Sequence, residues 1–167
     1  NIEGLLPHKV FNKGIFRTFQ ITREFNKMTV LENLMIVQHP QVGETIWNTW
    51  FRFKKVKKEE QAIKEKALKV LEFVELFNHR NTYAGSLSGG QKKLLELAKT
   101  MMAEPELVLL DEPGAGVNPT LMKKLIEKIR ELSEEQKMTF FLIEHDMDLV
   151  MNLCNPVIVM SEGKKLT

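Results

Sequence analysis

Two short stretches of the sequence carry residues whose types and spacing suit phosphate chemistry. In the first, SLSGGQ, the residues Ser88, Gly89 and Gly90 stand directly before an apolar helical repeat. The amino end of a helix presents unpaired N–H groups and a positive dipole end, and glycines let an anion approach the backbone closely. A serine at this position can also act as a plain helix cap. The stretch therefore predicts an anion site or a capped helix.

The second stretch is LVLLDEP, in which an apolar run ends at Asp111 and Glu112. A carboxylate at the end of a buried strand is suited to hold Mg²⁺, directly or through water. A neighbouring carboxylate could polarise a water molecule for in-line attack on a phosphate. Acidic residues at strand ends also serve as caps for a following helix. Taken alone, the stretch is compatible with either role.

His145 follows another apolar run, in the stretch FLIEHD. Its imidazole could hydrogen-bond a terminal phosphate or the attacking water. A single histidine is more often structural, and we interpret His8, His39 and His79 in that way. His145 differs from these three because it occupies the same kind of position, after an apolar run, as the two carboxylates.

The second half of the chain alternates between the elements needed to bring these residues together. Apolar runs predict strands and amphipathic segments predict helices. In chain order the expected elements are a strand at 106–110, a helix at 118–136, a strand at 138–144, a helix at 145–154 and a strand at 156–160. This order is typical of a parallel α/β sheet, in which ligands bind at the carboxyl ends of the strands. We therefore expect Asp111, Glu112, Glu144 and His145 in one crevice.

Composition excludes several other classes of protein. The chain has 167 residues, a net charge of +2 and a single cysteine, Cys154. One cysteine cannot form an internal disulfide and fits a reducing compartment. No apolar run approaches the ~20 residues that span a bilayer. The small net charge gives no indication of nucleic-acid binding.

Taken together, the stretches resemble the motifs of the ATP-binding cassette (ABC) ATPases in order and spacing. The stretches that carry the likeness are GIFRTFQ (14–20), LSGGQ (87–91), LVLLDEP (107–113), GVNP (116–119) and IEHD (143–146). They match the family's Q-loop approach, signature loop, Walker B segment, D-loop and switch histidine. The resemblance covers nearly the whole chain and is greatest to the subunits that power branched-chain amino acid uptake. Gly89 departs from that group, in which a tyrosine is frequent at this position.

The resemblance implies ATP and Mg²⁺ as ligands and gives each motif residue a role. It assigns catalysis to Glu112, His145 and Gln20, metal binding to Asp111 and Gln20, and nucleotide contacts to Ser88, Gly89, Gly90, Gln91 and Asn118. Two nucleotides would lie head to tail between two subunits. The glycine loop of one subunit would then face the carboxylates of the other.

The resemblance also implies the fold, an α/β, parallel-sheet, P-loop NTPase-like core that is partial and carries an inserted, mostly helical subdomain. We expect residues 1–24 to be a remnant of the amino-terminal nucleotide-binding core, ending in the Q-loop. Residues 25–85 would form the helical subdomain, and residues 86–167 the signature loop and the rest of the α/β core. No G-x-x-x-x-G-K-[ST] phosphate loop occurs in the sequence. We therefore expect a truncated copy of a full subunit that is inactive by itself.

The expected partners are a second ATPase subunit, identical or different, and transmembrane permease subunits. Through the permease the protein would be peripheral to the membrane on the cytoplasmic side of the cell membrane, and no nucleic acid is expected. The stretch ETIWNTWFRF, with Trp47 and Trp50, could contact the permease or lipid, although a small core of the helical subdomain is the favoured reading. Two other functions stay open: a non-transport ABC-type ATPase associated with DNA or ribosomes, and a non-catalytic ABC-like fragment.

Overall fold

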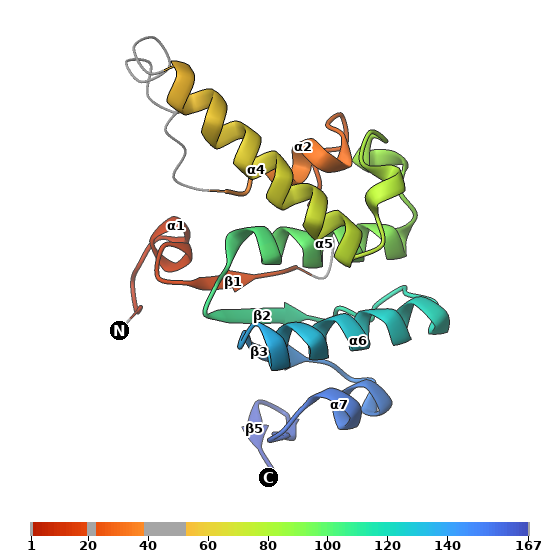
Figure 1. Ribbon diagram of the computed structural model, residues 1–167. Helices are drawn as coiled ribbons and strands as arrows, with labels where there is room; N and C mark the ends of the chain where they lie inside the picture. Colours follow the sequence, from red (N-terminus) through yellow and green to blue (C-terminus); the bar gives the residue numbers. More distant parts are fainter. Residues whose placement is uncertain (1, 20–22, 39–52, 167) are drawn as a thin grey trace.

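Three strands form a parallel sheet in the order β1-β2-β3. The computed structural model describes residues 2–19, 23–38 and 53–166. The strands are β1 (Ile15–Arg17), β2 (Leu107–Asp111) and β3 (Thr139–Ile143). Leu107 of β2 is in register with Ile15 of β1 and with Thr139 of β3. The parallel sheet and the strands expected near 106–110 and 138–144 are confirmed, and the carboxyl ends of all three strands point the same way (Figure 1).

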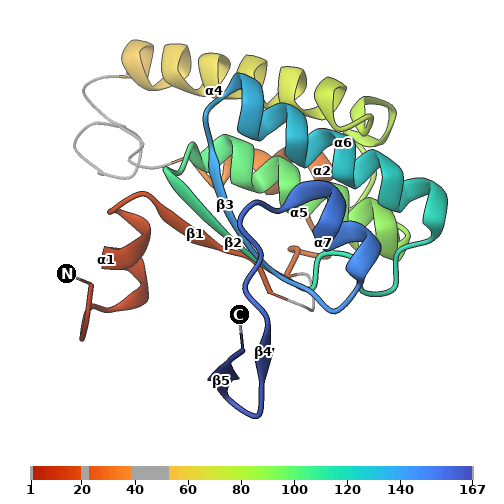
Figure 2. The ribbon, with the colours of Figure 1, turned by 90° about the horizontal axis from the view of Figure 1, so that it is seen from below.

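Two long helices, α5 (Gly89–Ala103) and α6 (Pro119–Glu135), cover one side of this sheet (Figure 2). The other described helices are α1 (Pro7–Phe11), α2 (Val30–Met35), α4 (Phe53–Phe73) and α7 (Met147–Leu153). Helices α2 and α4 lie beyond α5 (Figure 2). Two short 3-10 turns, η2 (Phe77–His79) and η3 (Ala84–Ser86), lead from α4 to α5. The parallel strands β2 and β3 require a crossover, which α6 provides.

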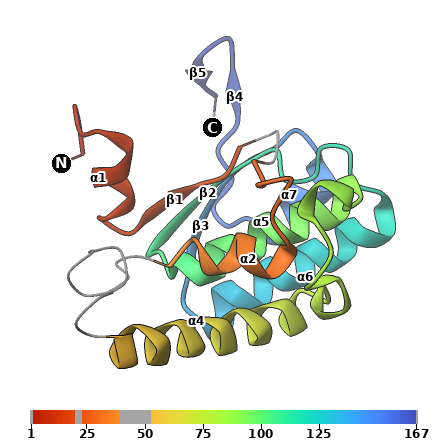
Figure 3. The same cartoon turned by 90° about the horizontal axis from the view of Figure 1, so that it is seen from above.

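The apolar stripes expected from the sequence form the core. Leu94, Leu97, Ala98 and Met101 of α5 are buried, and so are Leu125, Ile129 and Leu132 of α6. Ala67, Leu71 and Val74, at and after α4, are also buried. All of these side chains belong to one cluster that reaches the sheet through Val108 and Leu110. Helices α2 and α4 both contact α5 on the side that faces away from the sheet (Figure 3). The core therefore continues from the sheet, through α5, to α2 and α4.

The two faces of the sheet differ in how well they are covered. Val108 and Leu110 point to the helical side and are buried. On the alternate positions, Phe141 and Ile143 of β3 are 52% and 55% exposed. Successive side chains of a strand point to opposite faces. The second face of the sheet is therefore apolar and open near β3.

The strand expected at 156–160 is wrong. Residues 156–159 lie outside any strand, and β4 (Met160–Ser161) pairs antiparallel with β5 (Lys164–Lys165). Between them, Glu162 and Gly163 have φ of 47° and 75°. Positive φ at both central residues is the conformation of a tight hairpin turn, so local pairing prevails over the sheet. The apolar run indicated extended backbone but could not indicate its partner.

The expected boundaries between the nucleotide-binding core and the helical subdomain, at 24/25 and 85/86, remain a prediction. Within the described ranges, no helix is long and apolar enough to cross a membrane.

Candidate functional site

The glycine loop begins α5 with a complete capping box. The Ser88 hydroxyl accepts a hydrogen bond from the Gln91 backbone N–H at 3.3 Å, and the Gln91 side chain accepts one from the Ser88 N–H at 2.9 Å. The helix-cap interpretation is therefore correct, yet it leaves the anion interpretation possible. The Ser88 hydroxyl still has its proton to donate. The N–H groups of Gly89 and Gly90 belong to the first turn, where a helix offers them no partner of its own.

The two glycines differ in how closely the surrounding chain packs against them. A Cβ built on Gly90 would lie 1.9 Å from Cδ2 of Leu121, in the first turn of α6. A Cβ on Gly89 would meet no atom of the described chain within 4 Å. Gly90 is thus fixed by internal packing, whereas position 89 faces open space.

Gln91 has a second partner inside the subunit. Its Nε2 lies 3.1 Å from Nε2 of His79, at the end of η2. The Gln91 side chain is therefore held between the Ser88 backbone and the imidazole of His79, which we expected to be structural. His79 ties the turn after α4 to the start of α5. No sequence signal pointed to this pair, because the two residues belong to different local patterns.

At the carboxyl edge of the sheet, Glu112 and His145 lie next to each other. Oε1 of Glu112 is 3.4 Å from Nδ1 of His145, and Oε2 of Glu144 is 3.7 Å from the same nitrogen. The Glu112 N–H donates to the carbonyl of Ile143 at 3.0 Å, which joins the ends of β2 and β3. The structure thus brings together the residues that the strand order placed at one edge.

Glu144 differs from its neighbours because its side chain is only 1% exposed. Its two oxygens accept hydrogen bonds from the backbone N–H groups of Gly114, at 2.8 Å, and His145, at 3.2 Å. A Cβ on Gly114 would lie 2.9 Å from the Glu144 carboxylate. Glu144 therefore holds the loop after β2 through Gly114 and the loop after β3 through His145. The side chains of Glu112 and His145 remain accessible.

Glu112 also has an unusual backbone conformation, with φ of 45°. Glu75, Glu104, Lys137 and Glu162 share a positive φ, but these residues lie at helix ends and in a hairpin turn. A left-handed residue other than glycine costs about 1–2 kcal/mol. Strain of this kind, directly after a strand, is frequent where a side chain must be aimed at a ligand.

Asp111 pairs with Arg17 across the sheet. The Arg17 guanidinium lies 3.2 Å from Oδ2 of Asp111, whose side chain is 31% exposed. Sequence reasoning missed Arg17, because the pair depends on the register of β1 beside β2. Accessible carboxylate oxygens suit Mg²⁺, which commonly uses one or two carboxylates together with phosphate and water. Asp111 fits such a role, and a metal there would compete with the guanidinium.

The remaining site residues lie near the first turn of α6. Asn118 caps α6, and its Oδ1 accepts from the Leu121 N–H at 2.9 Å. Gly90 and Gly114 both pack against this turn, through Leu121 and Met122. The α6 start therefore stands between the glycine loop and the carboxyl edge. Gln20, Trp47 and Trp50 lie outside the described residues, so their predictions stay as made.

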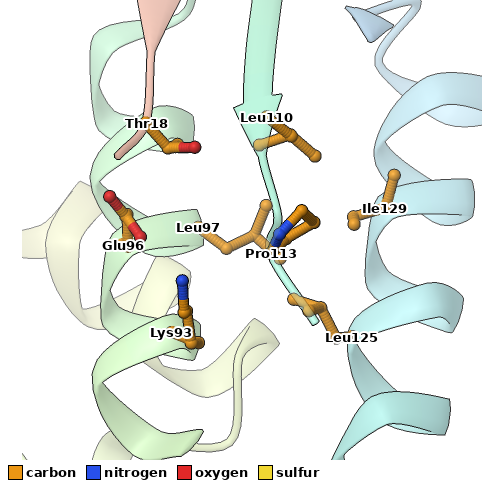
Figure 4. Close-up of a pocket in the computed structure, with 8 residues that line it drawn as sticks. All are labelled: Thr18, Lys93, Glu96, Leu97, Leu110, Pro113, Leu125 and Ile129. Carbon is orange, nitrogen blue, oxygen red and sulfur yellow. The ribbon is translucent and has the colours of Figure 1, made fainter. Parts of the chain in front are cut away.

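A small pocket lies between α5, β2 and α6 (Figure 4). Its lining residues are Thr18, Lys93, Glu96, Leu97, Leu110, Pro113, Leu125 and Ile129. A volume of about 10 Å³ is room for at most one water molecule, so this pocket is not a nucleotide site. Across the described part of the chain, no three His, Cys, Asp or Glu side chains are grouped to share a metal ion.

Comparison with known proteins agrees with the motif resemblance. The family model described as "ABC transporter" matches residues 5–115. The chain is 39% identical over 165 residues to the high-affinity branched-chain amino acid transport ATP-binding protein BraF of Pseudomonas aeruginosa. It is 42% identical over 161 residues to the probable branched-chain amino acid transport ATP-binding protein LivG of Archaeoglobus fulgidus. These matches cover 99% and 94% of this chain.

A solved structure, the ADP conformation of MJ1267, an ATP-binding cassette of an ABC transporter, has the same fold. It matches with a TM-score of 0.73 and 38% identity, over 96% of this chain and 62% of that one. The chain spans 65% of the length of the Pseudomonas relative and 60% of the Archaeoglobus relative. The fold class and the resemblance are therefore confirmed. The chain belongs to the ABC transporter family.

Proposed function

We propose that this chain serves in an ATP-binding and ATP-hydrolysing subunit of an ABC transporter that imports branched-chain amino acids. The observation that carries the activity is the pair of Glu112 and His145, 3.4 Å apart at the carboxyl edge and next to Asp111. The substrate class rests on the names of relatives that are 39% and 42% identical along almost the whole chain.

In this proposal Glu112 accepts a proton from the attacking water. His145 orients that water and the terminal phosphate, and its 79% exposed side chain is accessible to a ligand. Asp111 and Gln20 are the residues that would hold Mg²⁺, and the ion would then compete with Arg17 for the Asp111 carboxylate. Bound Mg²⁺ supplies charge neutralisation on the phosphates.

The glycine loop contacts a nucleotide held by a second subunit, identical or different. Ser88 donates through its hydroxyl, and Gly89 and Gly90 donate through the backbone N–H groups at the positive end of α5. Gln91 and Asn118 contribute mainly by holding the starts of α5 and α6 in shape. The open space at Gly89 supports this role, because a ligand or a partner can approach there.

Each of the three regions expected from the sequence has a role in this proposal. Residues 1–24 and 86–167 form parts of the nucleotide-binding core, and residues 25–85 form the helical subdomain that meets the permease. The protein then lies on the cytoplasmic side of the cell membrane, held there by its permease partners. The 167-residue chain alone is inactive because its sequence contains no phosphate loop.

The test is a chimera in which this chain replaces the matching part of the Pseudomonas aeruginosa relative. We expect Mg²⁺-dependent ATP hydrolysis by the purified chimera and leucine uptake in cells that lack the relative. Hydrolysis without uptake would refute the transport assignment. Absence of both, from a folded chimera, would favour a non-catalytic module.

The arrangement in a pair of subunits has its own test. Ser88→Arg in the chimera should abolish nucleotide-dependent dimerisation, because the long cation obstructs the α5 tip, while ATP still binds the monomer. Light scattering and calorimetry measure the two properties. Loss of ATP binding by the monomer would contradict a contact made across the dimer.

A further inference from the structure

His79 and Gln91 make the polar contact that joins the turn η2 to the glycine-led end of α5. Nε2 of Gln91 lies 3.1 Å from Nε2 of His79, across a sequence separation of 12 residues. Both side chains are half-buried. The surrounding hydrogen bonds determine which of the two side chains donates, and this in turn sets the protonation state that His79 must have.

The side-chain amide of Gln91 can take only one orientation here. The Ser88 backbone N–H is a donor, and its partner at 2.9 Å is Oε1 of Gln91. The –NH₂ group of the amide could not accept that hydrogen bond, so Oε1 must point to Ser88 and the –NH₂ group to His79. Gln91 is therefore the donor in its contact with His79.

His79 must then accept, which requires an Nε2 without a proton. In a neutral imidazole one ring nitrogen carries the proton and the other accepts, so the contact selects the neutral ring with its proton on Nδ1. A second proton, on Nε2, would place two donors 3.1 Å apart. Histidine side chains in general gain this proton around neutral pH, at about pH 6.5 in model peptides. Acid should therefore break the contact.

The charged side chains on the elements around His79 do not replace this contact. They are Glu72, Glu75, Arg80, Lys92 and Lys93, with Glu32 on the neighbouring α2. Glu75 pairs with Lys124 and Lys92 pairs with Glu24, each at 2.5 Å. Arg80 donates to a carbonyl of its own turn at 3.1 Å. Within the described residues, the polar partner of the His79 ring is thus the Gln91 amide.

The Gln91 side chain also completes the cap of α5, so His79 acts on the glycine loop through it. Without the His79 contact, the side chain regains rotamer freedom, and this entropy opposes the hydrogen bond from the Ser88 N–H to Oε1. The return bond, from the Gln91 N–H to the Ser88 hydroxyl, is long at 3.3 Å and belongs to the same cap. The shape of the loop therefore depends on a residue outside it.

We propose that His79 is a positioning residue of the glycine loop, whose neutral ring holds the Gln91 amide and thereby the capped shape of the loop. Protonation of His79 releases this hold. The effect on a second subunit rests on the proposed function, whereas the positioning itself depends only on the contacts described above.

NMR of the 167-residue chain tests the positioning without any substitution. The nitrogen chemical shifts of an imidazole distinguish its two neutral tautomers, and we expect neutral His79 to carry its proton on Nδ1. The Ser88 amide proton should shift as His79 is protonated, because Gln91 joins the two groups. His8, which is exposed on α1, is the control, and its titration should not move the Ser88 amide. A proton on Nε2 of neutral His79, or a Ser88 amide that does not follow the His79 titration, would overturn the proposal.

Two variants separate positioning from simple packing. His79→Ala removes the acceptor and should speed hydrogen exchange of the Ser88 amide about three- to tenfold near neutral pH, the effect of one hydrogen bond. His79→Gln can present an oxygen to the Gln91 amide, so it should keep most of the protection and lose the pH dependence. Equal acceleration throughout α6 and β3, or no rescue by glutamine, would show a merely structural role.

In the chimera, His79→Ala should weaken nucleotide-dependent dimerisation about three- to tenfold and leave ATP binding by the monomer unchanged, because the loop contacts the nucleotide of the other subunit. His79→Gln should restore dimerisation, and His8→Ala is the control that should not alter it. Light scattering and calorimetry measure the two properties. Unchanged dimerisation by His79→Ala would overturn the proposal. If the parent chimera neither dimerises nor hydrolyses ATP, the proposed function fails, and the NMR measurements decide the positioning alone.

Discussion

The glycine loop and the carboxyl edge use their polar side chains in opposite ways. At the glycine loop, Ser88 and Gln91 bond to backbone within the loop, so the groups left for a ligand are chiefly backbone N–H groups. At the carboxyl edge, Glu112 and His145 contact each other and solvent. We therefore expect substitutions in the loop to act first on folding and, if the proposed function holds, substitutions at the edge to act on ATP hydrolysis.

The largest expected effect is on the rate of ATP hydrolysis and comes from a substitution at the carboxyl edge. Glu112→Gln in the chimera should lower the rate of ATP hydrolysis at least about 100-fold, because the amide cannot take the proton of the attacking water. The free energy of unfolding should change by less than about 0.5 kcal/mol, since the side chain is partly exposed. Single-turnover hydrolysis and urea unfolding measure the two quantities. Equal turnover in variant and parent would remove Glu112 from the mechanism.

A second prediction separates the two glycines of the loop. Gly90→Ala forces a methyl group into Leu121 and should destabilise the fold by about 1–3 kcal/mol. Gly89→Ala meets open space and should be neutral, or stabilising by up to about 1 kcal/mol, because alanine favours helix. Urea unfolding of the 167-residue chain measures both. Equal effects of the two substitutions would show that the loop is not packed against α6 as described.

A third prediction concerns the cap itself. Ser88→Ala removes the acceptor of the Gln91 N–H and should cost about 1 kcal/mol of stability. Ser133→Ala, in an exposed position of α6, is the control and should stay within about 0.5 kcal/mol. A variant at Ser88 that is as stable as the control would mean that the hydroxyl is not needed for the cap.

The smallest expected effect is the pH dependence of stability that comes from Glu96, a half-buried residue of α5. Burial raises the pKa of Glu96 in the folded state above its unfolded value. The resulting stability is fully present below the unfolded pKa and is lost as pH rises through the folded pKa. Acidification from pH 7 towards pH 4 should therefore favour the parent over Glu96→Gln. Urea midpoints at several pH values test this, and a constant difference would contradict it.

Much of the fold was predictable because it depends on local patterns. The helical stripes of α5 and α6 and the apolar runs of β2 and β3 were found from periodicity alone. The caps formed by Ser88 and Asn118 involve residues three positions apart, so the sequence displays both partners together. The strand predicted at 156–160 was wrong because the turn at Glu162 and Gly163 decides which residues pair there.

The sequence by itself determined the motif residues, the elements that carry them and the family resemblance, since these depend on residue type and short spacing. Only the tertiary structure decided that Glu112 meets His145, that Arg17 pairs with Asp111, and that His79 contacts the Gln91 amide. Such contacts join positions far apart on the chain. They are fixed by strand register and helix packing, which no local pattern encodes.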